Sequence, residues 1–317
     1  MYKNKKVLIA GGTGMIGRQL VDLLLSKGAQ VFVSDIKIPE NEFLERVSFK
    51  KLDMTNYLNC VEACDGMDYV FNLLCAKGSP KAMKERPASH FDPMLLFNTN
   101  LMRAAKACNV EKYLYTSTLG VYAPAPVFYE DDVWKTHPSE NDRFAGWAKR
   151  MGELQAQAYQ IQYNWNDITI VRPANTYGPH DNFDSDSAMV VPSLVRKALS
   201  GASPLVVWGD GTNVRDFIHS TDVARGMLIA MKSGLGPRHP INLGSGTGYS
   251  INQLLETILA NVDDPPDVLR DMSKPTGDKT RVLDIERAKS IGFVPTVSIE
   301  DGIKDLVKWY KEHKIVK

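Results

Sequence analysis

The stretch VLIAGGTGMIG, residues 7–17, decides the fold of this chain. An apolar, β-branched run breaks into glycines at Gly11, Gly14 and Gly17, and an apolar pattern with helical spacing follows. This order predicts a strand, a tight turn and the N-terminus of a helix. Glycines at such a turn let the backbone approach a pyrophosphate, whose charge is stabilised by free N–H groups and by the helix dipole.

An acidic residue strengthens this interpretation. The glycine spacing is G-x-x-G-x-x-G, and Asp35 follows Gly17 by eighteen residues, at the end of a second apolar run over 31–34. A carboxylate there accepts hydrogen bonds from both hydroxyls of an adenosine ribose and repels a 2′-phosphate. The sequence therefore predicts NAD rather than NADP, although Lys37 softens the preference. A glycine-rich turn that binds nothing is the alternative that this context disfavours.

The amino-acid composition argues against several classes of function. The chain has 317 residues, of which 44% are hydrophobic and 24% charged, with a formal net charge of +1. The near-neutral charge, without a basic block, argues against a nucleic-acid partner. No apolar run approaches the roughly 18 residues of a membrane span. The four cysteines lack C-x-x-C and zinc spacings, so we expect reduced thiols in the cytoplasm and no metal site.

Strands and helices alternate over the first part of the chain. Strands are expected over 47–52, 69–74, 113–116 and 168–171, and long helices over 92–108 and 146–163. This alternation predicts an α/β fold, a doubly wound parallel Rossmann sheet whose ligands bind beyond the carboxyl ends of the strands. Residues 1–180, with later segments near 214–245, would form the dinucleotide-binding domain. Residues 181–317 would form a smaller, mixed α/β lobe that binds the substrate.

Further motifs occur in the order of a known family. They are GGTGMIG at 11–17, LDM at 52–54, YTSTLGVY at 115–122, Ala–Lys at 148–149, RPANTYGP at 172–179 and VRDFIHSTDVA at 214–224. On these motifs the chain resembles, over nearly its whole length, the extended short-chain dehydrogenases/reductases, NAD-dependent epimerases and dehydratases that act on nucleotide sugars. CAKGS at 75–79, YGPHDNF at 177–183 and VVWGDGTNVRDFIH at 206–219 are similar to the GDP-L-fucose synthase branch.

The resemblance implies positions around bound NAD. Asp53 has two interpretations, a hydrogen bond to the adenine amino group or a helix N-cap, since Asp53, Thr55 and Asn56 all cap helices well. The residues at cofactor positions are Gly11, Gly14, Met15, Ile16, Gly17, Asp35, Ile36, Asp53, Met54, Leu73, Leu74, Cys75, Thr116, Lys149 and Pro173.

The resemblance also implies a catalytic set. Thr118 matches the hydroxyl that hydrogen-bonds the sugar oxygen being oxidised. Lys149 matches the lysine that holds the nicotinamide ribose and lowers the pKa of a tyrosine four residues earlier. That tyrosine takes the hydroxyl proton as hydride leaves the carbon. In this chain its position holds Ala145, and neither Phe144 nor Trp147 beside it offers an acid–base group.

Ala145 leaves three interpretations open. One is an engineered Tyr→Ala change that holds a substrate without turnover. Another is a natural enzyme with a different acid–base group, for which Tyr122, Tyr177 and His180 are candidates. The third is a non-catalytic sensor that binds NAD and a nucleotide sugar, against which stand the intact hydroxyl, lysine and substrate motifs. A positioned acid–base group contributes about 10²–10⁴-fold to a rate, so its loss is costly.

Basic and amide residues are expected on the substrate side. Arg215 and Arg281 match positions that the family uses on the diphosphate of a nucleotide sugar, and arginine forks suit that role. A surface ion pair is the alternative meaning of each arginine. Asn175 resembles an asparagine that also contacts the diphosphate, and Lys77 follows the fourth strand. The candidate substrate-binding residues are Lys77, Thr118, Asn175, Val191, Arg215 and Arg281.

Departures from the family pattern favour one reaction. Gly120 and Asp184 stand where the 3,5-epimerase steps of GDP-L-fucose synthase use cysteine and histidine. Leu119 and Gly120 stand where 4,6-dehydratases carry an acid. Oxidation at C4 by tightly held NAD, with hydride returned to either face, makes the fewest further demands. We therefore expect a 4-epimerase of GDP- or UDP-sugars. The alternatives are a C4 dehydrogenase or 4-ketoreductase, an epimerase-reductase similar to GDP-L-fucose synthase, and a 4,6-dehydratase. In this family the helices over 92–108 and 146–163 pair across a homodimer.

Overall fold

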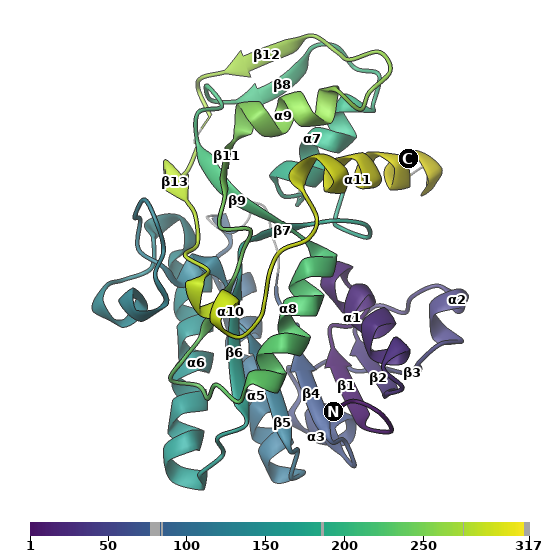
Figure 1. The fold of residues 1–317 in the computed structure, drawn as a ribbon, viewed down its shortest axis with the longest axis vertical. Coiled ribbons are helices and arrows are strands. Elements are labelled where there is room, and N and C mark those ends of the chain that lie inside the picture. Colours follow the sequence, from purple (N-terminus) through teal and green to yellow (C-terminus); the bar gives the residue numbers. More distant parts are fainter. Residues whose placement is uncertain (77–82, 84, 185–186, 275, 314–317) are drawn as a thin grey trace.

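A seven-stranded parallel sheet forms the centre of the computed structural model, which describes residues 1–76, 83, 85–184, 187–274 and 276–313 (Figure 1). The strand order is β10-β6-β5-β4-β1-β2-β3, and all neighbours run parallel. The chain winds outward from β1 in both directions, so the expected doubly wound Rossmann sheet is confirmed. The strands are β1 (Lys6–Ala10), β2 (Gln30–Asp35), β3 (Ser48–Lys51), β4 (Tyr69–Asn72), β5 (Lys112–Thr116), β6 (Ile168–Pro173) and β10 (Ile241–Leu243).

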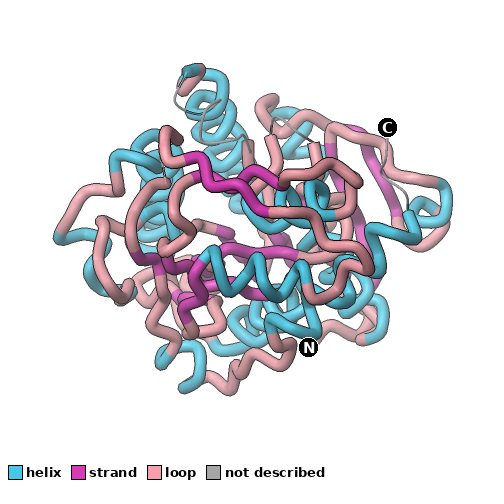
Figure 2. The backbone as a smooth tube through the Cα atoms, turned by 90° about the horizontal axis from the view of Figure 1, so that it is seen from above, coloured by secondary structure: helices cyan, strands magenta, loops and turns pink. Residues whose placement is uncertain are grey.

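Helices cover both faces of this sheet (Figure 2). One face packs its apolar side chains against α1 (Met15–Ser26) and α8 (Ser220–Ser233). The other face packs against α3 (Tyr57–Cys64), α5 (Ala88–Ala107) and α6 (Arg143–Tyr163). Two short helices, α2 (Asn41–Leu44) and α10 (Glu286–Ser290), lie at the edges. This layering leaves the carboxyl ends of the strands uncovered by the flanking helices. None of the described helices is long and apolar enough to cross a membrane.

A second lobe stands beyond those carboxyl ends, in the upper part of Figure 1. In it β9 (Val214–His219) pairs with β7 (Asn175–Tyr177), β11 (Gly248–Ser250) and β13 (Thr280–Arg281). A separate pair joins β8 (Leu205–Trp208) to β12 (Val268–Asp271). Helices α7 (Val190–Ala198), α9 (Ile251–Leu259) and α11 (Ile299–His313) share one apolar core with these strands.

The boundaries of some elements differ from expectation. The helices expected to start at 92 and 146 start at Ala88 and Arg143 instead. His219 is the N-cap of α8, and its Nδ1 accepts a 3.3 Å hydrogen bond from the Thr221 N–H. The division into domains at residue 180 stays a prediction. In the structure, β10 joins the large sheet while β9 belongs to the second lobe.

Candidate active site

The glycine turn between β1 and α1 is an open cradle for a phosphate. Gly14 is the N-cap of α1, is exposed, and has no side-chain cap or first-turn acid beside it. Gly11 has a φ of +81°, and a Cβ there would lie 3.2 Å from the Leu73 backbone. A Cβ on Gly17 would lie 2.6 Å from the Gly12 backbone. The uncapped N–H groups at the start of α1 therefore face a space suited to a pyrophosphate. Met15 is buried in the first turn and Ile16 is half-buried.

Asp35 ends β2 beside this turn. Its Oδ2 accepts hydrogen bonds from Thr13 Oγ1 (2.6 Å) and Thr13 N (3.4 Å), and its Oδ1 accepts from Ile36 N (2.8 Å). The carboxylate is half-buried and keeps lone pairs for further donors. Next to it the Ile36 side chain is 60% exposed, an apolar surface for a flat ring. This pair fits an adenosine.

Asp53 follows β3 and is exposed. Its carboxylate accepts hydrogen bonds from the backbone (2.9 Å) and hydroxyl (2.8 Å) of Thr55. The N-cap of α3 is Asn56, which accepts from Leu58 N. Asp53 therefore orders the turn before the helix rather than capping it. Met54 beside it is buried.

Lys149, on α6, points at the carboxyl ends of two strands. Its Nζ donates to the carbonyl of Thr116 (2.8 Å), the last residue of β5, and to the carbonyl of Leu74 (3.0 Å), after β4. The residue is only 3% exposed, and burial lowers its pKa, although the Cys75 thiol acts in the opposite sense. Thr116 Oγ1 is buried without a partner in the described part of the chain. The lysine, an orphaned hydroxyl and the exposed Cys75 thus gather at the centre of the sheet edge.

Thr118 and Ala145 stand near this lysine. Thr118 caps a short 3₁₀ turn, Leu119–Val121, and its Oγ1 accepts a 3.2 Å hydrogen bond from Gly120 N. Its hydroxyl hydrogen remains available to a ligand. Ala145 lies one helical turn before Lys149 and presents a methyl group to the apolar layer between α6 and the sheet.

The start of α6 is held tightly against Thr118's turn. A Cβ on Gly146 would lie 2.4 Å from Gly120 O and 2.7 Å from Pro138 Cβ, so only glycine fits. A cavity of about 270 Å³ lined by Arg143 and Trp147 lies on the opposite face of α6 from Ala145. That cavity is separate from the site.

A buried polar network supports the same edge. Ser117 Oγ donates to Glu153 Oε1 (2.5 Å), and Arg172 donates to both Glu153 oxygens (2.9 and 2.6 Å). The ion pair is fully buried. Arg172 also donates to the Tyr122 hydroxyl (2.9 Å), which donates to Asn242 Oδ1 (2.6 Å). This network ties β6, β10, α6 and the segment after β5 together.

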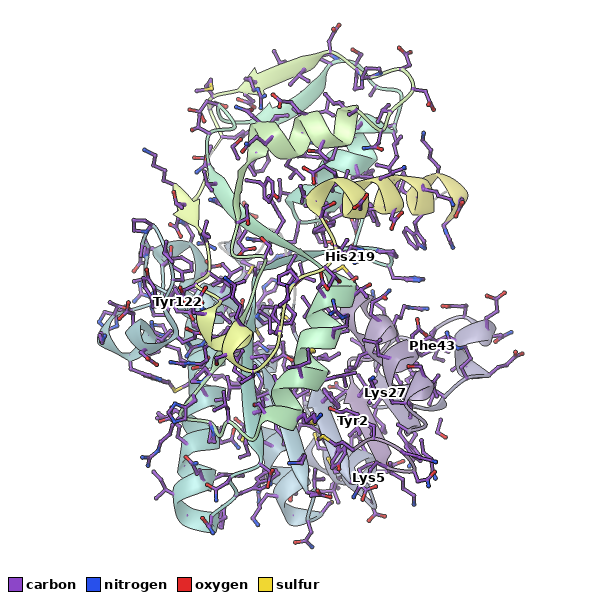
Figure 3. The ribbon with its side chains drawn as sticks, in the orientation of Figure 1. Tyr2, Lys5, Lys27, Phe43, Tyr122 and His219 are labelled. Carbon is purple, nitrogen blue, oxygen red and sulfur yellow. The ribbon has the colours of Figure 1, made fainter. Side chains whose placement is uncertain are left out.

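The alternative acid–base groups named from the sequence have other partners. Tyr122 is committed to the buried network, and burial raises its pKa far above the ordinary value. Burial likewise raises the pKa of Tyr177, whose hydroxyl packs against Gly302 of α11. The His180 ring packs on Trp309 of α11, with centroids 4.9 Å apart. Figure 3 labels Tyr122 and also His219, which lies at the upper end of α8 where the lobes meet.

The two substrate-side arginines lie on adjacent, paired strands, with Arg215 opposite Arg281 in register. Arg215 donates to the carbonyls of Val214 (2.8 Å) and Thr276 (3.3 Å), and among the described residues no carboxylate is ion-paired with it. Burial, together with Arg281, lowers the pKa of Arg215 to about 10. Burial also lowers the pKa of Arg281, but two carboxylates, Asp142 and Asp278, outweigh it and raise that pKa.

The remaining substrate candidates are spread around the junction of the lobes. Asn175 Nδ2 donates to Asp216 O (2.9 Å), so β7 holds it beside β9. Val191 is buried in the first turn of α7, and Pro173 is buried at the end of β6. Lys77 lies outside the described residues.

One residue near the site was missed from the sequence. Asp142 precedes α6, and a Cβ placed on Gly120 would lie 3.2 Å from its Cβ and 3.5 Å from its Oδ1. Its Oδ2 is ion-paired with Arg281 at 2.5 Å. Twenty-two residues separate Gly120 from Asp142, and no local pattern signals their contact.

Comparison with known proteins decides the family. Residues 7–244 match the NAD dependent epimerase/dehydratase family. The chain belongs to this family. A probable GDP-L-fucose synthase 1 of Oryza sativa subsp. japonica is 30% identical over 99% of this chain and 94% of its own length. The family's members are enzymes of the extended short-chain dehydrogenase/reductase group, and the cofactor is NAD.

Two solved structures share the whole fold. A UDP-glucose 4-epimerase of Thermotoga maritima, solved with UDP-glucose, is 26% identical, with a TM-score of 0.85 over 98% of this chain and 99% of its own. A UDP-glucose 4-epimerase of Thermus thermophilus, solved with NAD, is 25% identical, with a TM-score of 0.84 over 96% of this chain and 99% of its own. The uncapped glycine cradle, the Asp35–Ile36 pair and the orphaned Thr116 hydroxyl fit NAD.

Proposed function

We propose that this enzyme transfers hydride at C4 of a nucleoside-diphosphate sugar and acts as a 4-epimerase. The observation that carries the proposal is the convergence of Lys149, Thr116 and the Thr118 turn at the edge where β4 and β5 end. These groups lie between the glycine cradle on one side and the paired arginines of the second lobe on the other. A dinucleotide and a nucleotide sugar laid along these two sites would meet there.

Each group has a role in this proposal. Lys149 holds the nicotinamide ribose hydroxyls, exchanging one carbonyl partner for them. Thr118 donates its hydroxyl hydrogen to the sugar C4 oxygen. Arg215 and Arg281 bind the diphosphate, with Asn175 beside them, and Val191 and Lys77 border the sugar and nucleoside. Bound NAD supplies the hydride acceptor.

Inversion at C4 is the reaction that this set supports best. A 4-epimerase removes and returns the same hydride, so it needs no further acid at a neighbouring carbon. The similarity to GDP-L-fucose synthases favours a second candidate, reduction of a 4-keto sugar by the same groups. We propose GDP- or UDP-hexoses as substrates, with the nucleotide base and the sugar taken from the relatives as a class.

The proposal also covers the oligomeric state of the protein and its compartment in the cell. Helices α5 and α6 carry exposed apolar side chains, which suit a homodimer through these helices: Leu96, Phe144, Met151, Leu154, Ile161 and Tyr163. All four cysteines are free, which suits the reducing cytoplasm. We also propose that the dinucleotide-binding domain comprises residues 1–180 with later segments near 214–245, among them α8 and β10.

The decisive experiment changes position 145. The chain as given, Ala145→Tyr and Ala145→Phe are incubated with NAD and GDP-, UDP- and dTDP-hexoses, and products are identified by NMR. Tyr adds a positioned phenol hydroxyl and Phe adds the ring alone, so turnover by the Tyr variant beyond that of the Phe variant reports proton transfer by a group at position 145. A C4-inverted product supports epimerisation. Accumulation of a 4-keto sugar with reduced nicotinamide supports the dehydrogenase alternative. No turnover by any of the three, with nucleotide sugar still bound, overturns the proposed function in favour of a binding protein.

A further inference from the structure

The space beside the catalytic hydroxyl segment is occupied by a carboxylate from a distant part of the chain. Gly120 follows Thr118 by two residues, and its missing side chain leaves room for Asp142. The Asp142 Cγ and Oδ1 lie 3.3 Å and 3.5 Å from where a Gly120 Cβ would stand. Oδ1 therefore lies over the turn that holds the catalytic hydroxyl.

The surroundings of Asp142 fix it in this place. It precedes the first residue of α6, and Gly146, one turn on, touches the Gly120 carbonyl. On the other side Arg281 pairs with Oδ2 of Asp142 and also with Asp278 Oδ2, through Nε at 2.9 Å. Ser139 (3.0 Å) and Asn141 (2.7 Å) donate to Asp278 Oδ1. The loop before α6 is thus clamped to β13 of the second lobe.

Other titratable groups near the site are less suited to moving a proton. Ala145 has none, Lys149 donates to two carbonyls, and the Tyr122 hydroxyl belongs to the buried network. The Cys75 thiol is exposed after β4, next in the chain to Leu74, a carbonyl partner of Lys149. Among the groups described, Asp142 alone presents a carboxylate against the Thr118–Gly120 turn.

We propose that Asp142 is the proton acceptor and donor for the sugar hydroxyl in this enzyme, in place of the side chain that position 145 lacks. The assignment rests on the proposed function, hydride transfer at C4. In the oxidative half-reaction the C4 hydroxyl proton moves to Asp142. The C4–H bond breaks and its electron pair leaves as hydride to the nicotinamide of NAD, so that C4 becomes a ketone. The reverse half-reaction returns the proton from Asp142 to the C4 oxygen as hydride returns to C4.

Arg281 couples this role to substrate binding. A diphosphate on Arg215 and Arg281 competes with Asp142 for the Arg281 fork. Asp142 then loses an ionic partner when the sugar binds, and its carboxylate is released from Arg281. The diphosphate, which does not react, therefore frees the proposed acid–base group.

The test compares two carboxylates bound to the same arginine. Asp142→Asn removes the proposed acid–base group and keeps a side chain of nearly the same size and shape. Asp278→Asn is the matched control, because it also removes a carboxylate from Arg281 but lies away from Gly120. Cys75→Ser tests the competing thiol. Ala145→Tyr, alone and combined with Asp142→Asn, supplies an independent acid–base group. Steady-state rates with the responsive nucleotide sugar are measured against pH, and UDP or GDP affinity is measured by calorimetry.

We expect Asp142→Asn to lower kcat by about 10²–10⁴-fold and to abolish the acidic limb of the pH profile. Asp278→Asn should act on KM and on nucleotide affinity, with that limb kept. Calorimetry of the Asp142→Asn protein should show UDP or GDP binding retained, which separates lost chemistry from a misfolded site. Adding Tyr at 145 to the Asp142→Asn protein should restore turnover, with a pH profile set by the phenol.

Three results overturn the Asp142 assignment alone. One is an unchanged kcat and pH profile in Asp142→Asn. Another is an equal loss in Cys75→Ser. The last is turnover by Ala145→Tyr with none by the chain as given, which leaves the proposed function standing and removes Asp142 from it. Failure of every variant, Ala145→Tyr included, to turn over any sugar overturns the proposed function itself and the Asp142 assignment with it.

Discussion

Ser117 Oγ donates a 2.5 Å hydrogen bond to Glu153, a carboxylate that is itself buried in an ion pair with Arg172. Ser117 directly precedes Thr118, the residue proposed to supply the catalytic hydroxyl, and Glu153 follows Lys149 by one turn of α6. A single buried carboxylate therefore sets the spacing between the segment that carries the hydroxyl and the helix that carries the lysine.

Removing the charge of Glu153 should be costly for stability. Glu153→Gln leaves Arg172 buried without its counter-charge, and we expect unfolding free energy to fall by about 3–5 kcal/mol. The matched control is Glu62→Gln, which breaks the exposed ion pair with Lys50 and should cost about 0–1 kcal/mol. Urea denaturation measures both. Equal small losses in the two variants would contradict the role assigned to the buried pair.

His219, the N-cap of α8, should make the protein less stable in acid. Burial lowers the pKa of His219, against the opposing effect of the Asp222 and Asp305 carboxylates. The unfolded chain takes up a proton on this histidine near its usual pKa of about 6.5, whereas the folded chain does so only at lower pH. The contribution of the neutral ring is therefore complete above about pH 6.5 and is lost as the pH falls below it.

His219→Asn isolates this effect, because asparagine caps a helix without titrating. Its melting temperature should fall less than that of the unchanged chain between about pH 7.5 and pH 5. Thermal denaturation followed by circular dichroism at several pH values gives the two slopes. Parallel slopes would mean that other groups carry the pH dependence.

Cysteine reactivity should report on cofactor binding. Cys75 is exposed beside the ends of β4 and β5, whereas Cys60 and Cys64 are buried, and burial raises the pKa of Cys60 to about 12. We expect a thiol reagent to modify Cys75 first and NAD to protect it. Mass spectrometry of the alkylated chain identifies the site, and AMP, which lacks the nicotinamide, serves as the control ligand. Equal protection by AMP would place Cys75 away from the nicotinamide.

The Asp35 carboxylate should set coenzyme preference. Asp35→Ser removes the negative charge that faces the adenosine ribose, so NAD affinity should fall while the affinity for NADP relative to NAD rises by about tenfold or more. Thr13→Val is the companion change, because it removes the hydroxyl that donates to Asp35 and keeps the charge. Calorimetry with both coenzymes measures the ratios. An unchanged ratio in Asp35→Ser would remove Asp35 from the ribose site.

Much of the fold could be predicted because its signals are local. The strands predicted over 69–74, 113–116 and 168–171 correspond to β4, β5 and β6. Strands of two or three residues, such as β7 and β13, carry too few positions for an alternating pattern to show. The helix that the sequence predicts from residue 92 begins at Ala88, because no capping side chain marks its start.

The candidate site also contains parts that the sequence predicts and parts that it does not. The glycine cradle and Asp35 are contiguous motifs, so the sequence predicts their neighbourhood. The contact between Asp142 and Gly120 is made by packing of the loop before α6, and its ionic support comes from Arg281, 139 residues further along the chain. Glycine at 120 was interpreted from the sequence as the absence of an acid. In three dimensions it is what admits one.

The absence of room for a Cβ at Gly146 has a consequence for enzyme design. Contact of Gly146 with the Gly120 carbonyl and the Pro138 ring, rather than any side chain at 145, fixes the distance between α6 and the segment that carries Thr118. The side chain at position 145 can therefore be exchanged without moving α6. Histidine, glutamate or cysteine introduced there would start from the same Cα position and direction. Different acid–base side chains at position 145 can thus be compared while the other groups of the proposed site stay the same.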